Sequence, residues 1–393
     1  MPSACRHAMR RYLLLPLLLA SLPAAHAANC DGLPALAAPT APGLCAGIVA
    51  DGLHQPRGIA VLADGSVLVS EMRRWDAPTG RLLRFSQQNG RWQRQTLLRQ
   101  LDRPHSVAQL ADGSILLGEV GRISRFNLAN PQQRQTLATL PARQRHPLTT
   151  FTLAGDTLYV NIGSSSNNCE QASAAQRQAG RCAEVEGDAA TGVVRRYRWD
   201  GSALQYQGVF ARGLRNSMAI SVHPSGSVLQ VENSRDGIHL PLGLPDDNEL
   251  PHDELNLLQA GRHYGWPFCY DNAVTAPEFP GYNCRQSAKP LRLLPAHAAP
   301  LGLAWWQGGN APAAWRDWLV IGYHGYRQHG QRVVAFASDA RGLPRGAGVT
   351  LLGPWRGQHG PAGPVEIKAA ADGSLWLTDD RNGQLLRLVA HSR

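Results

Sequence analysis

The stretch Arg212-Gly213-Leu214-Arg215-Asn216 decides how the rest of the chain is interpreted. It places an arginine and an asparagine directly before an apolar run at 218–222. A Pro-Ser-Gly turn at 224–226 separates this run from a second one at 227–231. Two short apolar runs joined by a turn predict a pair of antiparallel strands. Polar side chains at the mouth of such a pair occupy a typical position for the chemistry of an all-β enzyme.

The same unit, a polar residue followed by two apolar runs with a turn between them, recurs along the chain. A more divergent copy covers residues 297–323. Short strands, regular turns and a period of about fifty residues are typical of propeller blades. We therefore expect an all-β fold, a six-bladed β-propeller over residues 50–393. The turn of the opening stretch is Ser225-Gly226, and the turns of the remaining copies lie at Asp64-Gly65, Asp112-Gly113, Gly155-Asp156 and Asp372-Gly373.

The first 27 residues have the features of a secretory signal peptide. Three arginines precede an apolar segment at 12–22, and Ala25-His26-Ala27 forms a cleavage motif. The apolar segment is too short to span a bilayer, so the pattern predicts removal on export. No later segment is long and apolar enough for a membrane span. We expect a periplasmic or secreted protein.

Six cysteines follow the signal peptide in three local couples. An even number of cysteines at short spacings in an exported chain indicates disulfides, although other connectivities stay open. Local pairing would place one disulfide in an N-terminal extension, residues 28–49. The other two would tie long loop insertions, one in the third blade and one after the fourth. The expected pairs are Cys30 with Cys45, Cys169 with Cys182, and Cys269 with Cys284.

The formal net charge of +10 comes almost entirely from arginine, because Lys289 and Lys368 are the only lysines. The arginines are scattered and form no basic run, so we expect no nucleic-acid interface. Compositional bias explains this scattered excess of arginine. The functional alternative is that the positive charge creates an electrostatic field that attracts an anionic ligand.

The blade register predicts which side chains face the channel. Each first strand lines the channel, so the residue before it lies at the channel mouth. Histidine moves protons near neutral pH, and arginine binds carboxylates in a bidentate manner. A single histidine at one of these positions is interpreted as a turn or surface residue. Together, the residues at the channel mouth form a ring, and this set predicts a functional site. The ring consists of Arg57, His105, His146, Arg215, Asn216, His297 and His359.

Several phrases resemble the glucose/sorbosone dehydrogenase family, from about residue 50 to residue 390. Asn-Ser-Arg-Asp and His-Gly-Tyr-Arg are most similar to its sorbosone-dehydrogenase-type branch. The motifs of zinc proteases, serine hydrolases, P-loop proteins and nicotinamide enzymes are absent. The phrases are Gly-Leu-Arg-Asn at 213–216, His-Pro-Ser-Gly at 223–226, Asn-Ser-Arg-Asp at 233–236, Asp-Glu-Leu-Asn at 253–256, Tyr-Gly-Trp-Pro at 264–267, His-Gly-Tyr-Arg at 324–327 and Asp-Gly-Ser-Leu-Trp-Leu-Thr-Asp-Asp at 372–380.

The resemblance implies a periplasmic oxidoreductase that uses pyrroloquinoline quinone (PQQ) with calcium. Such an enzyme oxidises an aldose or sorbosone-type sugar at the anomeric carbon and passes hydride to PQQ. The electrons then pass to a separate acceptor, a quinone or a cytochrome. His297, a member of the ring, is assigned to the substrate pocket. The resemblance further implies His146 as catalytic base, His105, Arg215, Asn216 and Arg327 as cofactor contacts, and the backbone carbonyls of Ser234 and Arg235 as calcium ligands.

Two departures from the family pattern leave an alternative open. The family's metal loop is often Glu-Asn-Gly-Pro, whereas residues 232–235 are Glu-Asn-Ser-Arg. The family also carries an arginine before the sixth blade's first strand, where this chain has Ala362-Gly363-Pro364 and only Arg356 nearby. The alternative is a redox-inactive propeller that binds a sugar or a partner protein on the same face. A calcium-dependent lactonase needs acidic channel ligands, which the basic ring does not supply.

Overall fold

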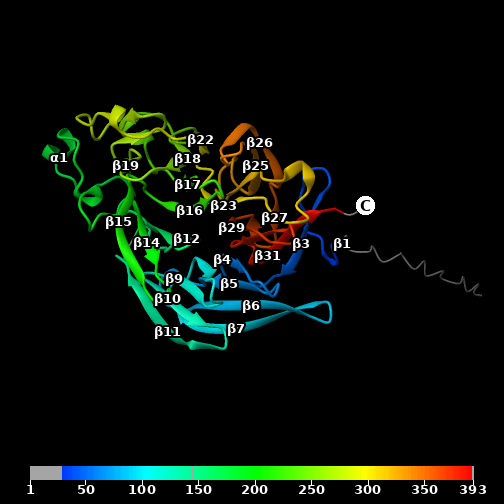
Figure 1. Cartoon of the computed structure of the whole chain (residues 1–393). Helices are drawn as coiled ribbons and strands as arrows, with labels where there is room; N and C mark the ends of the chain where they lie inside the picture. Colours follow the sequence, from blue (N-terminus) through cyan, green and yellow to red (C-terminus); the bar gives the residue numbers. More distant parts are fainter. Residues whose placement is uncertain (1–28, 143–144, 392–393) are drawn as a thin grey trace, which may run out of the picture.

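A computed structural model describes residues 29–142 and 145–391 (Figure 1). Six antiparallel sheets follow one another along the chain, and first strands of successive blades pack together around the centre. The expected six-bladed β-propeller is confirmed. The predicted signal peptide, residues 1–27, lies outside the described residues.

The strands of the blades are as follows. Blade 1 has β4 (Pro56–Val61), β5 (Val67–Glu71), β6 (Gly80–Gln88) and β7 (Arg91–Leu101). Blade 2 has β8 (Val107–Gln109), β9 (Ile115–Glu119), β10 (Arg122–Asn127) and β11 (Asn130–Thr139). Blade 3 has β12 (Phe151–Ala154), β13 (Thr157–Ile162), β14 (Val193–Trp199) and β15 (Leu204–Arg212), with β19 (Arg262–His263) added at its edge.

Blade 4 has β16 (Ser217–Val222), β17 (Val228–Glu232), β18 (His252–Leu258) and β22 (Arg292–Ala296). Blade 5 has β23 (Pro300–Trp305), β24 (Leu319–Tyr323), β25 (Arg332–Ser338) and β26 (Pro344–Leu352). Blade 6 has β29 (Pro364–Ala369), β30 (Leu375–Asp379), β31 (Gln384–Ala390) and β3 (Leu44–Ala50). Short hairpins join β1 (Asn29–Cys30) to β2 (Leu33–Pro34), β20 (Cys269–Tyr270) to β21 (Val274–Thr275), and β27 (Arg356–Gly357) to β28 (Gly360–Pro361).

The turn between the first two strands explains why Asp-Gly-Ser recurs in the sequence. In blade 1, Asp64 Oδ1 accepts a hydrogen bond from the Ser66 backbone N–H at 2.9 Å. The glycine between them is left-handed, with a φ of 78°, a conformation that glycine adopts without steric cost. The same aspartate–serine bond recurs in blades 2 and 6. A local sequence motif thus sets the register of these blades.

The N-terminal strand β3 closes the ring by pairing with the C-terminal strand β31, for example Ala46 with Leu388. In Figure 1 the blue β3 lies beside the red β31. This pairing corrects the boundary drawn at residue 50, because β3 supplies the outer strand of blade 6. The sequence of β3 has no alternating pattern that distinguishes it from a loop. Its pairing with the C-terminal strand β31 therefore could not be predicted from the sequence.

Two insertions, residues 163–192 and 259–291, pack against each other at the outer edge of blades 3 and 4. Their shared apolar cluster contains Cys169, Trp266 and Phe279. The first insertion includes α1 (Ala174–Gln178), and α2 (His239–Leu242) lies in the loop after β17. No helix in the described part of the chain is long and apolar enough to cross a membrane. The three expected disulfides, Cys30–Cys45, Cys169–Cys182 and Cys269–Cys284, are confirmed.

Closure by β3 generates a stability prediction. Ala46 is 2% exposed, so Ala46→Asp would bury an unpaired carboxylate in the blade 6 sheet. We expect a loss of about 3 kcal/mol or more in the free energy of unfolding, measured by urea titration. Ala37→Asp, at an exposed position before β3, is the matched control and should change stability little. Equal urea midpoints for the two variants would show that β3 is dispensable.

Candidate functional site

Two adjoining cavities lie where the loops before the first strands meet the loops after the second strands. The larger has a volume of about 810 Å³ and is lined mainly by residues of blades 1, 5 and 6. The smaller has a volume of about 360 Å³ and borders blades 4 and 5. Asn216, Leu301, His324 and Tyr326 line both, so the two cavities are continuous. A separate hollow of about 460 Å³ lies in the first insertion, away from the predicted ring.

A buried aspartate organises the larger cavity. Asp380 Oδ2 lies 3.0 Å from Arg57 Nη2, and Asp380 Oδ1 lies 2.9 Å from His324 Nε2. The Nη2 of Arg381 lies 3.1 Å from His324 Nδ1. Arginine can only donate, so His324 Nδ1 accepts and its proton sits on Nε2, which donates to Asp380. Burial raises the pKa of Asp380, but the hydrogen bond from His324 and the charges of Arg57 and Arg381 outweigh it and lower that pKa.

Arg215 has no N–H group left for a ligand. Its Nε and Nη2 donate to Asn167 O and Asn167 Oδ1, at 3.2 and 2.8 Å. Its Nη1 donates to Asn233 O at 3.1 Å and Ser234 O at 3.0 Å, and Nη2 also donates to Asp236 Oδ2 at 2.9 Å. A guanidinium has five N–H donors, so the protein uses them all. Arg215 lines the smaller cavity and contributes positive charge to it, but none of its N–H groups is free to donate to a ligand there.

Asn216 is the polar group that the strand entrance leaves available. Its backbone N–H donates to Glu232 Oε1 at 2.8 Å, which fixes the residue at the start of β16. Among the described residues its side-chain amide has no hydrogen-bond partner, and it lines both cavities. Burial raises the pKa of Glu232 to about 7, so this anchor titrates near neutral pH.

Asp253 places a second shifted carboxylate in the wall of the smaller cavity. It accepts hydrogen bonds from the backbone N–H groups of Ser234, at 2.9 Å, and Ala299, at 2.7 Å. Burial raises the pKa of Asp253 to about 7 despite these bonds. Strongly shifted carboxylates in a cavity are typical of functional sites. Asp253 therefore has the protonation behaviour of an acid–base group.

His146 is half-buried and is held by the first insertion. Its Nδ1 lies 3.1 Å from Ser164 O and 2.8 Å from Ser164 Oγ. The hydroxyl of Ser164 donates to Ser166 O at 2.6 Å, so both Ser164 oxygens act as acceptors for His146. The Nδ1 atom must then carry the proton of the ring, and Nε2 keeps a lone pair that can accept a proton. Burial, with the nearby charges of Arg215 and Arg145, lowers the pKa of His146 to about 3, so the ring is neutral.

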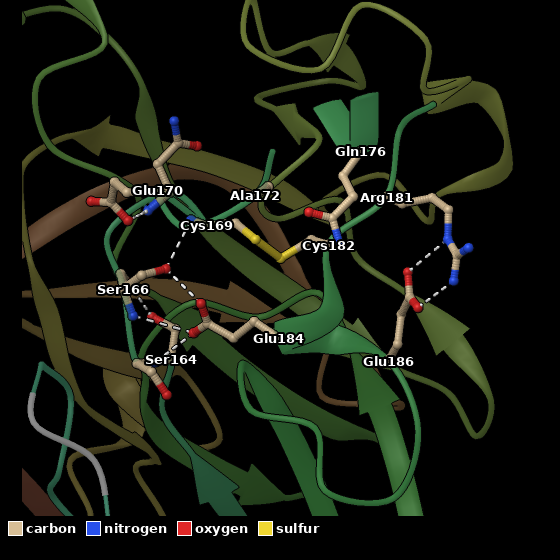
Figure 2. Close-up of a disulfide and its surroundings, with 12 residues drawn as sticks. Ser164, Ser166, Cys169, Glu170, Ala172, Gln176, Arg181, Cys182, Glu184 and Glu186 are labelled. Atoms are coloured by element: carbon tan, nitrogen blue, oxygen red, sulfur yellow. Dashed lines mark hydrogen bonds and ion pairs between the residues drawn. A yellow bond between two sulfur atoms is a disulfide. The ribbon is translucent and has the colours of Figure 1, made fainter. Parts of the chain in front are cut away.

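The segment that holds His146 is itself fixed beside the Cys169–Cys182 disulfide (Figure 2). The Glu184 carboxylate accepts the Ser166 hydroxyl at 2.6 Å, and Figure 2 shows the two side chains facing each other. The backbone N–H of Ser164 donates to Arg215 O at 2.8 Å. Although Cys169, Cys182 and Glu184 lie close together, the two sulfurs are bonded to each other and form no metal centre. The insertion therefore connects the His146 environment to Arg215.

His105 lies beneath the larger cavity and does not line it. It is 1% exposed, and neither ring nitrogen has a hydrogen-bond partner among the described residues. Burial, and then the charge of Arg57, lowers the pKa of His105 to about 3. Gly58 packs directly over it, since a Cβ at Gly58 would lie 2.1 Å from His105 O.

Arg327 and His297 lie in the smaller cavity and share one acidic partner. Arg327 Nη2 donates to Asp247 Oδ1 at 2.8 Å, and Nη1 donates to Asn248 at 3.1 Å. His297 Nε2 lies 2.7 Å from Asp247 O. His297 has a left-handed φ of 54°, a conformation that non-glycine residues retain mainly where surrounding contacts require it.

The contacts of Ser234 and Arg235 do not fit a calcium ion held by their carbonyls. Ser234 O already accepts from Arg215, whose positive charge opposes a second cation there. The Arg235 side chain points to Glu278, with Nη1 2.7 Å from Oε1, and lines neither cavity.

The structure brings most of the predicted ring together and leaves three predicted site residues outside the cavity walls: His105, His146 and Arg235. Sequence reasoning missed His324, Tyr326 and Asp380, although the phrases quoted at 324–327 and 372–380 contain them. It missed Arg73, Trp75, Arg381 and Asn167 because no motif or repeat marks these positions. The predicted residues that line the cavities are Arg57, Arg215, Asn216, Ser234, His297, Arg327 and His359.

The buried, uncharged state of His105 predicts a pH effect on stability. Its folded pKa of about 3 lies below the unfolded value of 6.5, so below pH 6.5 the unfolded chain binds a proton that the folded chain does not. Stability is therefore lost as pH falls. Between about pH 7.5 and about pH 5, wild type should lose about 2 kcal/mol more than His105→Gln in urea titrations. Parallel pH profiles for the two proteins would contradict this assignment.

Comparison with solved structures supports the fold. An iodide structure of the Trichoderma reesei carbohydrate-active enzyme family AA12 is 23% identical, covers 92% of this chain and 100% of that chain, and has a TM-score of 0.73. The holo PQQ domain of pyranose dehydrogenase from Coprinopsis cinerea is 21% identical, covers 92% and 99%, and has a TM-score of 0.70.

Sequence comparison identifies the family. An uncharacterised protein of Borreliella burgdorferi is 28% identical over 194 residues, which are 46% of this chain and 48% of that protein. The chain thus spans about half the length of this relative. The sequence model of the TrAA12-like family matches residues 38–390, from before β3 to the end of β31. The chain therefore belongs to the TrAA12-like family.

Proposed function

We propose that the protein is a PQQ-dependent oxidoreductase that oxidises an aldose or sorbosone-type sugar at the anomeric carbon. The observation that carries this proposal is the continuous pair of cavities, which joins cationic side chains, a free amide and shifted acid–base groups on one propeller face. Membership of the TrAA12-like family and the likeness to a solved PQQ domain of a pyranose dehydrogenase support it.

The residues present fit PQQ, a planar quinone with three carboxylates. The larger cavity offers arginine side chains for the carboxylates, and the exposed rings of Trp75 and Tyr326 offer flat surfaces at its rim. Asn216 would donate or accept a hydrogen bond where the two cavities meet. Arg215 would contribute its positive charge without a direct hydrogen bond. When bound, PQQ supplies the acceptor for the hydride of the sugar.

His146 is the proposed catalytic base. Its Nδ1–H is committed to Ser164, so Nε2 is the ring atom left to take the proton of the anomeric hydroxyl. The smaller cavity, with His297 and Arg327 in its wall, is the proposed sugar-binding region. His105 is 1% exposed and lies outside the cavity walls, so we propose no direct cofactor contact for it. We further propose a periplasmic or secreted location and transfer of electrons to a separate acceptor, a quinone or a cytochrome.

Reconstitution tests the proposal directly. PQQ added to purified apoprotein should bind in calorimetry and give sugar-dependent dye reduction across a panel of aldoses. His146→Gln should lower kcat by roughly 100-fold or more while leaving the PQQ Kd unchanged, because proton transfer contributes this much to such reactions. His391→Gln, at an exposed histidine near the C-terminus, is the matched control. Absence of PQQ binding and turnover would contradict the proposal, and sugar binding without PQQ would instead support the redox-inactive alternative.

The pH profile distinguishes His146 from Asp253 as the base. A base must be deprotonated, so one with a pKa of about 3 stays active when the pH falls, whereas one with a pKa of about 7 does not. We expect kcat/KM to change little between about pH 8 and about pH 5, and to fall only at lower pH. An acid limb centred near neutral pH would assign the proton transfer to Asp253.

A further inference from the structure

The larger cavity carries positive charge that its own walls do not neutralise. Arg57, Arg73 and Arg381 line it, and Asp380 is the one acidic side chain among its described lining residues. The smaller cavity is balanced, because Arg215 and Arg327 face Asp236 and Asp253. The excess is therefore confined to the side formed by blades 1 and 6.

Asp380 is fully used by two neighbours and does not neutralise Arg381. Its carboxylate pairs with Arg57 and accepts from His324 Nε2, as described above. Among the described residues, the Arg381 guanidinium makes its direct contacts with uncharged groups: His324 Nδ1, the Ala362 carbonyl, to which Nη1 donates at 2.6 Å, and the Tyr326 ring, whose centroid lies 3.5 Å from its Cζ. A half-buried guanidinium without a counter-ion favours an anionic ligand.

Arg73 adds a second unneutralised charge from blade 1. It follows β5, is half-buried and, within the described part of the chain, pairs with no carboxylate. Its φ of 67° is left-handed, a strained conformation for a non-glycine residue that clusters at functional positions. Arg57, beside it, is 5% exposed, and its Nε has no hydrogen-bond partner among the described residues.

Arg381 lies beside the position where the sequence lacks an arginine before the sixth blade's first strand. Residues 362–364, where β29 begins, carry no arginine. Arg381 comes after β30 of the same blade, yet its Nη1 lies 2.6 Å from Ala362 O. Because Pro364 pairs with Asp379, residues 362 and 381 face each other at the open end of this hairpin, and the Arg381 guanidinium lies beside residue 362. Arg356 is exposed on β27 and lines neither cavity.

We propose that Arg381 and Arg73, supported by Arg57 and Asp380, form an anion subsite that binds the carboxylate groups of the cofactor. This proposal rests on the proposed function, since PQQ is the carboxylate-bearing ligand. Tyr326, stacked on Arg381, and Trp75, with its ring centroid 5.7 Å from Arg57 Cζ, flank the subsite. The two rings are 74% and 49% exposed, so part of each stays open to a planar ligand in the cavity. Arg57 acts as a positioning residue, because Asp380 occupies part of its guanidinium.

Calorimetric titration of PQQ into apoprotein tests this subsite. Arg381→Gln and Arg73→Gln should each raise the PQQ Kd by about tenfold or more, since each removes a charge-assisted hydrogen bond. Arg381→Lys should recover part of the loss, because it keeps the charge but not the paired donors. Arg356→Gln is the matched control and should bind within about twofold of wild type. Thermal melts identify any variant that fails to fold, and Arg73→Gln breaks no ion pair of the described structure.

The outcomes separate this inference from the function on which it rests. Wild-type affinity in both glutamine variants, with active wild-type enzyme, would overturn the subsite and leave the function standing. A wild-type protein that binds no PQQ would contradict the proposed function first. A parallel titration with glucuronate distinguishes the source of the carboxylate. Loss of glucuronate binding with unchanged PQQ binding would overturn the proposal in favour of an acidic-sugar subsite.

Discussion

The arrangement of the candidate site depends on the guanidinium of Arg215, because all of its N–H groups donate hydrogen bonds to the protein. Arg215 donates its N–H groups to the first insertion, through Asn167, and to the loop after β17, through Asn233, Ser234 and Asp236. Removal of Arg215 would leave several buried carbonyl groups without a donor, which is costly in an environment of low polarity. This side chain therefore fixes the wall of the smaller cavity and the segment that positions His146.

The insertions contribute to the site through the same contacts. The Trp266 indole of the second insertion donates to Asn167 O at 3.0 Å, so both insertions meet at the residue that binds Arg215. Ser164, a few residues earlier, sets the tautomer of His146 and donates its backbone N–H to Arg215 O. Two disulfides limit the motion of these loops. A rigid support of this kind is what a preorganised site requires.

Charge is distributed unevenly over the paired cavities. Near Arg215 the charges are balanced and fully hydrogen-bonded, and Asn216 is left as the available polar group. On the side of blades 1 and 6, Arg73 and Arg381 lack counter-ions within the described structure. A ligand with carboxylates at one end and neutral polar groups at the other matches this distribution.

The sequence predicted the features that depend on local patterns. The Asp-Gly-Ser turns define blade register, and short cysteine spacings predicted all three disulfides. Features that depend on partners distant in the sequence were not predictable: strand β3 pairs with the C-terminal strand, and Arg381 contacts Ala362 across the open end of the β29–β30 hairpin. The prediction for Arg215 identified its place but not its role, because hydrogen-bond saturation is a property of the folded environment.

A crystal structure of the protein with PQQ tests the central claim most directly. We expect one planar ligand in the larger cavity, with carboxylates at Arg73 and Arg381, the quinone end beside Asn216 where the two cavities meet, and the hydrogen bonds of Arg215 to Asn167 and Ser234 intact. A ligand with its carboxylates at Arg215 or Arg327, or one bound outside these cavities, would contradict the account.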